Sequence, residues 1–403
     1  MSYAPVTALS VSLHSAPVGK LALSDRRVWF QYDAAFLHKS LELSPFKLPL
    51  KPDVVACEDR VFDGLFGLFN DSLPDGWGRL LLDRHMRSLG IAPENLTVLD
   101  RLACVGQNGM GALTYVPDHS PDNTKDRQLD LDRLAAESHA VLEGATGNMI
   151  EELLALNGSS AGARPKIMAG ISHDKKHIIH GADTLPDNYE HWIIKFTSGS
   201  DPADNGAIEY AYSLMARAAG IAMPETYLFP SAKGAGHFGV KRFDRNGNKR
   251  IHVHTVSGLL HADYRLPSMD YIDILKAALA LTRSMPDVEA LFRLACFNVF
   301  VRNRDDHAKN FSFLMEDDGT WHTAPAYDLT FSAGPVGEHS TTIMGEGKKP
   351  NHSHLQALGK KLGLKKTDEI IDQTHTAIAN WSEFSETAGV SRQSSKLIKN
   401  NIG

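Results

Sequence analysis

A short polar segment in the C-terminal half of the chain carries the residue types best suited to chemistry. Residues 302–310 read Arg-Asn-Arg-Asp-Asp-His-Ala-Lys-Asn, and Asp328 follows within a Tyr-Asp-Leu triplet. Transfer of a phosphoryl group needs one free carboxylate to orient the attacking hydroxyl, and hard oxygen ligands for Mg²⁺. Asp305 and Asn310 have the spacing D-x-x-x-x-N that supplies both. Asp305 is therefore a candidate catalytic base, and Asn310 and Asp328 are candidate magnesium ligands.

The segments around this loop strengthen the assignment. Residues 288–301 are predicted to form a largely buried helix that leads into the loop, and residues 311–314 a strand. A hairpin turn over residues 316–319 then returns the chain towards Asp328. Helix, polar loop, hairpin and acidic residue follow in the order of a kinase C-lobe. The alternative is a solvated turn capped by acidic side chains.

Lys195 is the single basic residue of a strand-like run, His-Trp-Ile-Ile-Lys-Phe, over residues 191–196. A lysine on a strand could bind the α- and β-phosphates of a nucleotide. Alternatively, it is an edge-strand lysine whose stem covers apolar surface while its ammonium group stays in water. Glu209 opens the helix predicted next, over residues 207–219, and could pair with Lys195. An acidic residue is also favoured at a helix start by the helix dipole alone.

Two further loops could contact a nucleotide. Residues 157–166 read Asn-Gly-Ser-Ser-Ala-Gly-Ala-Arg-Pro-Lys, and small residues let backbone N–H groups approach an anion closely. This loop is neither a Walker A loop nor the G-x-G-x-x-G of eukaryotic kinases. Residues 240–245, Val-Lys-Arg-Phe-Asp-Arg, end a predicted strand and suit the hinge that holds adenine. Their charges could equally mark an exposed hairpin tip.

The composition is that of an ordinary globular protein. The chain has 403 residues, 42% of them hydrophobic, and a net charge of −6, which argues against broad binding of nucleic acid. Its three cysteines are widely spaced without a C-x-x-C pair, which favours reduced thiols over structural zinc. His252 and His254 alternate along a short strand and are interpreted as structural. With no signal-peptide pattern and no apolar run of ~20 residues, we expect a soluble, cytoplasmic protein.

Three units are predicted along the chain. Residues 1–116 form an N-terminal unit with strands near residues 20–23, 28–32 and 113–116. After a polar linker, residues 129–250 form a second unit of mixed helices and strands, and residues 251–403 a mainly helical third unit.

Together these residues resemble the HipA family of bacterial serine/threonine kinase toxins, from about residue 17 to 385. The strongest parts of the resemblance are residues 159–166, 192–196, 209–221, 240–245, 303–313 and 327–329. The resemblance implies an α+β, bilobal, protein-kinase-like fold with an additional N-terminal β-rich subdomain and a helical C-lobe. It implies ATP and Mg²⁺ as cofactors.

The same resemblance assigns roles by position. Asp305 corresponds to the catalytic base, Asn310 and Asp328 to the magnesium ligands, and Lys195 to the nucleotide-phosphate lysine. Ser159 corresponds to a serine that such kinases autophosphorylate, with Ser160 an adjacent competitor. The implied nucleotide-contacting residues are Ser160, Ala161, Gly162, Ala163, Lys166, Lys195, Lys241, Phe243, His307 and Lys309.

Family members usually partner a helix-turn-helix antitoxin that represses their operon, and known members phosphorylate an aminoacyl-tRNA synthetase. Contact with nucleic acid is then expected only through the partner, and none with membranes. Two departures indicate a distinct branch: the segment Asp-Ser-Leu-Pro-Asp-Gly-Trp-Gly-Arg over residues 71–79, and Lys241 where an acidic residue is expected. A small-molecule or lipid kinase on the same scaffold, and a nucleotide-binding regulator of a DNA-binding partner, are the alternatives.

Overall fold

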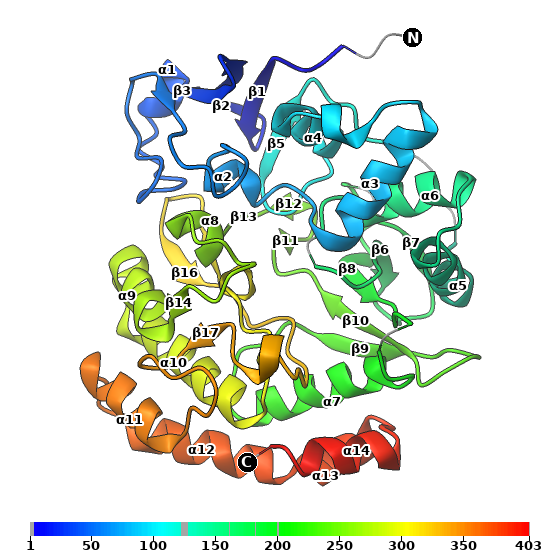
Figure 1. The fold of residues 1–403 in the computed structure, drawn as a ribbon, viewed down its shortest axis with the longest axis vertical. Helices are drawn as coiled ribbons and strands as arrows, with labels where there is room; N and C mark the ends of the chain where they lie inside the picture. The colour runs from blue at the N-terminus through cyan, green and yellow to red at the C-terminus, as the bar shows by residue number, and fades with distance from the viewer. Residues whose placement is uncertain (1–3, 122–127, 161, 182, 200, 403) are drawn as a thin grey trace.

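The N-terminal part of the chain forms a five-stranded antiparallel sheet bordered by short helices (Figure 1). The computed structural model describes residues 4–121, 128–160, 162–181, 183–199 and 201–402. The strand order is β4-β3-β2-β1-β5. The strands are β1 (Ala8–Leu13), β2 (Ala16–Ser24), β3 (Arg27–Tyr32), β4 (Val55–Ala56) and β5 (Leu113–Val116). The helices are α1 (Ala34–Leu37), α2 (Gly67–Asn70), α3 (Gly76–Ser88) and α4 (Val98–Val105).

A second antiparallel sheet forms a small lobe beside this unit. Its strand order is β7-β6-β8-β10-β9. The strands are β6 (Lys166–Ser172), β7 (Ile178–His180), β8 (Tyr189–Lys195), β9 (Thr226–Phe229) and β10 (His237–Lys241). The helices are α5 (Leu131–Leu142), α6 (Asn148–Asn157) and α7 (Asn205–Ala218). The helix predicted over residues 207–219 and the strand predicted at residues 191–196 are thus confirmed within a few residues.

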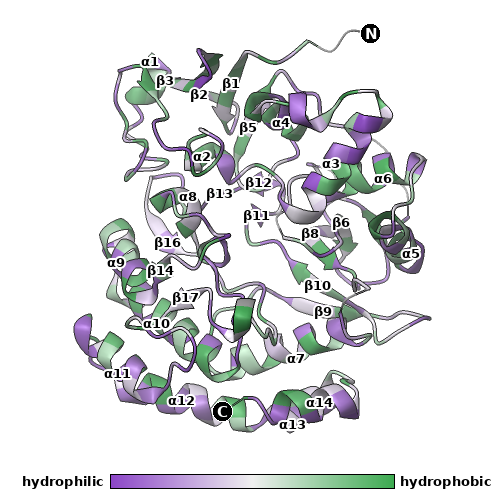
Figure 2. Ribbon diagram, viewed as in Figure 1, coloured by the Kyte–Doolittle hydropathy of each residue, from purple (hydrophilic) through white to green (hydrophobic). Residues whose placement is uncertain are grey.

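The rest of the chain forms a mainly helical C-lobe around a small three-stranded sheet, β13-β15-β16. The sheet consists of β13 (His252–Thr255), β15 (Ser312–Met315) and β16 (Trp321–Thr323). The first helices are α8 (Val256–Leu260), α9 (Tyr271–Thr282) and α10 (Met285–Phe300). The last helices are α11 (His352–Lys361), α12 (Thr367–Ala379), α13 (Trp381–Thr387) and α14 (Arg392–Lys399), which line the bottom of the molecule with alternating hydrophobic and hydrophilic surfaces (Figure 2).

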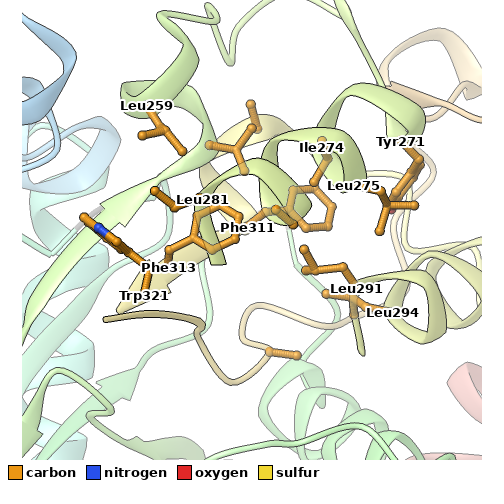
Figure 3. Close-up of a cluster of buried hydrophobic side chains, with 14 of the residues drawn as sticks. Leu259, Tyr271, Ile274, Leu275, Leu281, Leu291, Leu294, Phe311, Phe313 and Trp321 are labelled. Atoms are coloured by element: carbon orange, nitrogen blue, oxygen red, sulfur yellow. The ribbon is translucent and has the colours of Figure 1, made fainter. Parts of the chain in front are cut away.

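Aromatic and branched side chains fill the C-lobe core where α8, α9 and α10 meet the small sheet. Figure 3 shows Leu259, Tyr271, Ile274, Leu275, Leu281, Leu291, Leu294, Phe311, Phe313 and Trp321 in this cluster. Removing such side chains from water is the main contribution to the stability of a domain. Trp381 is buried, and the centroid of its ring lies 5.5 Å from that of Tyr212 of α7, so the last helices also pack against the small lobe.

The N-terminal unit contacts both lobes. Buried residues of its sheet belong to the same apolar cluster as those of α9 and α10 in the C-lobe. Trp77, Leu81 and Leu82 of α3 belong instead to a second cluster, with α6 and with β6 and β8 of the small lobe. The two shared cores explain how the unit can be rigidly placed against the cleft between the lobes.

Candidate active site

A cavity of about 1050 Å³ opens between the two lobes and the N-terminal unit. Its wall contains every described residue that the sequence nominated for the site. These are Ser159, Ser160, Gly162, Ala163, Lys166, Lys195, Lys241, Phe243, Asp305, His307, Lys309, Asn310 and Asp328. Ala161, also nominated, lies outside the described residues. Segments up to 170 residues apart in the chain therefore meet at one place.

Lys195 lies at the centre of this site. Its strand β8 runs between β6 and β10, so the interpretation as an edge-strand lysine is wrong. The side chain is 11% exposed, and its ammonium group donates to Glu209 Oε2 at 2.7 Å and to a carboxylate oxygen of Asp328. Burial alone would lower the pKa of Lys195, but the carboxylates of Asp328 and Glu209 outweigh it and raise that pKa.

Glu209 is held in place for this pairing. Helix α7 begins at Asn205, so Glu209 lies in its second turn and not at its start as predicted. The helix dipole therefore does not explain an acidic residue here, because its effect falls off within the first turn. Glu209 is 1% exposed and also accepts a hydrogen bond from Asn205 Nδ2 at 3.1 Å. A buried carboxylate of this kind is retained where it has a cation to bind.

Asp305 stands at the open side of the cavity. The loop that carries it begins after α10 and ends in a short 3₁₀ turn, Ala308–Asn310. The Asp305 side chain is 56% exposed, and its carboxylate lies 3.9 Å from His307 Nε2. Asn310 Nδ2 donates to the Asp305 backbone oxygen at 2.6 Å and so fixes the turn. Restricted solvation in the cavity raises the pKa of Asp305, against the opposing effect of His307, and the Asp328 carboxylate raises it further.

A buried network that the sequence analysis missed supports the same loop. The Asp306 side chain is 0% exposed and accepts hydrogen bonds from Tyr271 Oη and His339 Nδ1, both at 2.9 Å. Thr341 donates to it twice, from its backbone N–H to the carboxylate at 3.2 Å and from its hydroxyl to the backbone oxygen at 2.5 Å. His339 and Thr341 lie more than 30 residues downstream, a distance at which no spacing pattern signals a contact.

Asp328 has the donor chemistry of a magnesium ligand. Its backbone φ is +57°, in the left-handed region that residues other than glycine rarely adopt, and such strain is concentrated at functional sites. Lys195 first, and then Lys166 and Arg164, hold the pKa of its carboxyl well below the usual range, although burial opposes them. A carboxylate ionised at all ordinary pH values, in the same cavity as the amide oxygen of Asn310, supplies hard oxygen ligands that fit Mg²⁺.

The Gly-rich loop, here defined as residues 158–165, closes the cavity from the small lobe. The hydroxyls of Ser159 and Ser160 are both buried, each residue being 1% exposed. The Ser159 hydroxyl accepts the backbone N–H of Met110 at 2.7 Å, and the Ser160 hydroxyl donates to Asn157 Oδ1 at 2.8 Å. Lys166, just after the loop, is buried, and this burial lowers its pKa to about 8. Lys166, Lys195 and Lys309 all line the cavity and bring positive charge to it.

The segment predicted to hold adenine lines the cavity at the end of β10. Strand β10 ends at Lys241, whose ammonium group contacts Glu190 at 2.5 Å, and the Phe243 ring contacts that of Tyr327 at 5.4 Å. The charges that follow are not an exposed hairpin tip. Asp244 is 0% exposed and accepts hydrogen bonds from Arg242 and Arg245, both at 2.7 Å.

The two alternating histidines hold the N-terminal unit to the C-lobe. His254 lies between Asp71 at 2.6 Å and Ser44 at 2.9 Å, and His252 faces the backbone oxygen of Leu43 at 3.2 Å. These partners confirm a structural role. Within the described ranges, no three His, Cys, Asp or Glu side chains are grouped to hold a metal ion, and no helix has the length and apolar character needed to cross a membrane.

Comparisons with known proteins agree with this architecture. Residues 9–116 match the HipA N-terminal domain, and residues 158–381 match the HipA-like C-terminal domain. A relative in Sinorhizobium fredii, "Putative kinase Y4dM", is 27% identical over 402 residues, which cover 91% of this chain and 90% of that protein. A second, "Putative kinase Y4mE", from the same organism, is 27% identical over 342 residues, or 77% of each chain.

A solved structure shares the fold. HipA in the complex of the Shewanella oneidensis toxin–antitoxin system HipA, HipB and its operator DNA superposes with a TM-score of 0.70 at 18% identity. The match covers 98% of this chain and 94% of that one, so the mixed α/β kinase-like arrangement extends over the whole molecule. With both of its characteristic domains present around one cleft, the chain belongs to the HipA family.

Proposed function

We propose that the protein is an ATP- and Mg²⁺-dependent kinase that phosphorylates a serine or threonine hydroxyl of a cytosolic protein. The observation that carries the proposal is the pairing of Lys195 with Glu209 and Asp328, in one cavity with the exposed carboxylate of Asp305. A lysine–glutamate pair, an acidic metal ligand and a free base are the parts that phosphoryl transfer requires. The designation of two relatives as kinases supports it.

Each residue would act at a separate point of the reaction. Bound MgATP supplies the γ-phosphoryl group and the metal charge that neutralises the oxygens around it. Lys195 binds the α- and β-phosphates, while Asn310 and Asp328 hold the metal. Asp305 orients the acceptor hydroxyl and takes its proton as the new P–O bond forms and the bond to the β-phosphate oxygen breaks, releasing ADP.

The remaining nominated residues surround the nucleotide in this proposal. Lys166 and Lys309 add positive charge near the phosphates, and the backbone of the Gly-rich loop faces them. Phe243 and Lys241, with apolar residues of the cavity wall such as Val240 and Met223, hold the base. Ser159, or its neighbour Ser160, is proposed as the site of autophosphorylation.

The acceptor and the partner are proposed from the family resemblance. We infer a component of translation, such as an aminoacyl-tRNA synthetase, as the acceptor, and a helix-turn-helix antitoxin as the partner. The solved Shewanella complex contains HipB and operator DNA, which supports a partner of that class. A short helix-turn-helix reading frame next to the gene for this chain is the expected companion.

Phosphoproteomics after expression of the wild type and of Asp305→Ala tests the function. We expect protein phosphosites that appear with the wild type and fall by on the order of 10²-fold or more in the variant. MgATP affinity, measured by calorimetry on both proteins, should stay the same because Asp305 contacts the acceptor. Formation of ADP without any phosphoprotein would point to a small-molecule or lipid kinase, and binding without turnover to a nucleotide-dependent regulator.

A further inference from the structure

Asp75, in the N-terminal unit, joins the two loops of the cleft. Its carboxylate accepts a hydrogen bond from the backbone N–H of Gly162 in the Gly-rich loop. Its second oxygen accepts a hydrogen bond from Lys309 Nζ at 2.8 Å. Lys309 lies in the loop of residues 302–310 that carries Asp305, here called the catalytic loop. The Asp75 and Lys309 side chains are only 14% and 7% exposed, so water screens this pair weakly.

The position of Asp75 makes this contact unexpected from local structure. It is the N-cap residue of α3, where an aspartate normally accepts N–H groups of its own helix. Here its side chain makes no such cap and is directed to the two loops instead. Burial alone would raise the pKa of Asp75, but Lys309 and the Gly162 N–H lower it, so the carboxylate stays charged.

The residues after Asp75 bring the chain close enough for this contact. Trp77 donates its backbone N–H to the Gly162 carbonyl oxygen at 3.0 Å. Gly76 has a φ of +39°, and a Cβ atom there would lie 2.6 Å from the Ala163 Cα atom. Only glycine permits both the backbone conformation and the approach. We call Asp75, Gly76 and Trp77 the latch.

A second segment of the N-terminal unit contacts the same loop at Ser159. The backbone N–H of Met110 donates to the buried Ser159 hydroxyl. Two neighbouring carbonyls, those of Gly109 and Gly111, accept from Arg250 at 2.7 and 2.9 Å, and Gly111 N–H donates to Asp244 at 2.8 Å. Hydrogen bonds to Arg250 and Asp244 thus hold the segment that carries Met110, and the N-terminal unit contacts the Gly-rich loop at both Ser159 and Gly162.

We propose that Asp75 is a positioning residue for nucleotide binding, through which the N-terminal unit holds the Gly-rich loop over the catalytic loop. The inference rests on the proposed function and adds a regulatory consequence to it. Any partner or modification that moves the N-terminal unit away from the loop lowers nucleotide affinity without touching a nucleotide-binding residue. Asp75 itself contacts no reacting atom in this scheme.

Substitutions in the full-length chain separate the parts of the latch. Asp75→Ala removes both contacts, while Asp75→Asn keeps an oxygen for Gly162 and loses the charge that faces Lys309. Gly76→Ala acts through shape alone. Asp83→Asn is the matched control, because Asp83 lies on the same helix and its ion pair with Arg101 at 2.7 Å stays within the N-terminal unit.

The measurements are calorimetric MgATP affinity, melting temperature, and hydrogen exchange of the backbone amides in residues 158–165. Asp75→Ala should weaken MgATP binding by roughly tenfold or more, the scale of a lost charge-assisted hydrogen bond. Asp75→Asn should lose less, and Asp83→Asn should stay within about twofold of the wild type. Exchange in the Gly-rich loop should rise in the Asp75 and Gly76 variants only. Where phosphoryl transfer is measurable, the KM for ATP should rise more than kcat falls.

The outcomes are distinct. Unchanged or tighter MgATP binding by a folded Asp75→Ala protein overturns the inference, and so does unchanged exchange in the loop. A wild type that binds no MgATP contradicts the proposed function instead, and the exchange experiment, which needs no nucleotide, still decides whether Asp75 holds the loop. Asp75→Asn preserves side-chain size, so it provides the answer if the alanine protein fails to fold.

Discussion

The catalytic loop and the Gly-rich loop face each other across the cavity but are held in opposite ways. The catalytic loop is supported mainly from within its own lobe, with the contact of Lys309 to Asp75 as its link to the N-terminal unit. Asp306 is buried against Tyr271, His339 and Thr341, and Asn303 donates to the side chain of Asn298 at 3.0 Å. The backbone of the loop around Asn303 and Asp306 therefore takes its shape when the C-lobe folds, because these hydrogen bonds are part of that lobe's interior.

The Gly-rich loop depends on a different part of the chain. Gly162 hydrogen-bonds to Asp75 and Trp77, and the Ser159 hydroxyl to Met110, all of the N-terminal unit. Arg164, near the end of the loop, also forms an ion pair within the small lobe, with Asp201 at 3.0 Å. Small residues with few side-chain contacts leave such a loop near the low end of local stability. We call the catalytic loop the permanent half of the site and the Gly-rich loop the conditional half. The conditional half is the one that would contact the nucleotide phosphates.

Removal of the Asp306 side chain, which supports the catalytic loop, should have the largest effect of the changes considered, and that effect is on stability. Asp306→Ala leaves His339 and the Tyr271 hydroxyl buried without their acceptor, and we expect a loss of about 3–5 kcal/mol in the free energy of unfolding. Urea denaturation measures this directly. The folded fraction should bind MgATP nearly as well as the wild type while losing transfer activity. A fall in affinity as large as that of Asp75→Ala would show that the two halves are not independent.

The metal ligands come next in size. Asp328→Ala should weaken Mg²⁺-dependent ATP binding by more than about tenfold, or about 1.4 kcal/mol, since it removes a charged ligand for a hard cation. Asn310→Ala removes a neutral ligand and should cost less. Calorimetry with and without Mg²⁺ gives both values. Equal MgATP affinity in the wild type and both variants would contradict the assignment of these residues as metal ligands and leave them with a purely structural role in the loop.

The conditional half should respond to charge on Ser159. Its hydroxyl is buried against Met110, so a phosphate, with about −1.5 to −2 charge, has no room there and repels bound nucleotide phosphates. Ser159→Asp carries less charge and should lower MgATP affinity on the order of tenfold, while Ser159→Ala loses one neutral hydrogen bond and should cost only about 1 kcal/mol.

Mass spectrometry after incubation with MgATP identifies which serine is modified. A preparation that phosphorylates another protein but carries no phosphate on Ser159 or Ser160 would refute this switch and leave the kinase proposal intact. Ser160→Ala separates the two candidate sites, because that hydroxyl bonds to Asn157 of α6 and not to the N-terminal unit.

The sequence could predict features that depend on residues close together in the chain, and it could not predict contacts between residues far apart in the chain. Asp305, Asn310 and Lys195 could be nominated because the roles proposed for them impose short spacings or a strand pattern that is visible locally, and the structure brings all three to one cavity. Strand β1 was overlooked although Leu9, Val11 and Leu13 alternate with less buried residues, the usual signal of a half-buried strand. The alternation of residues 8–13 is therefore sufficient to predict this strand.

Other features had no local signal. Asp75 precedes a glycine and a helix, which reads as a turn and an N-cap, and its actual partners lie 87 and 234 residues away. The pair of Asp306 with His339 depends in the same way on tertiary structure. Residues that connect units are thus harder to predict than those that perform the chemistry, because their partners follow from packing and not from spacing.

The smallest expected effect distinguishes two neighbouring lysines by pH. Lys195 is flanked by two carboxylates that raise its pKa, so it stays charged. Burial lowers the pKa of Lys166 to about 8, Asp328 opposes that shift, and the charge of Lys195 adds to it. Nucleotide phosphates favour the protonated amine, so affinity should be complete below pH 8 and fall as the pH rises through that value, by at most about tenfold between pH 7 and 9. Calorimetric titrations of the wild type and Lys166→Met across this range measure the slope. The variant should bind MgATP more weakly, and its affinity should not change with pH over this range. A slope that persists in Lys166→Met would assign the titration to another group and remove Lys166 from the nucleotide site.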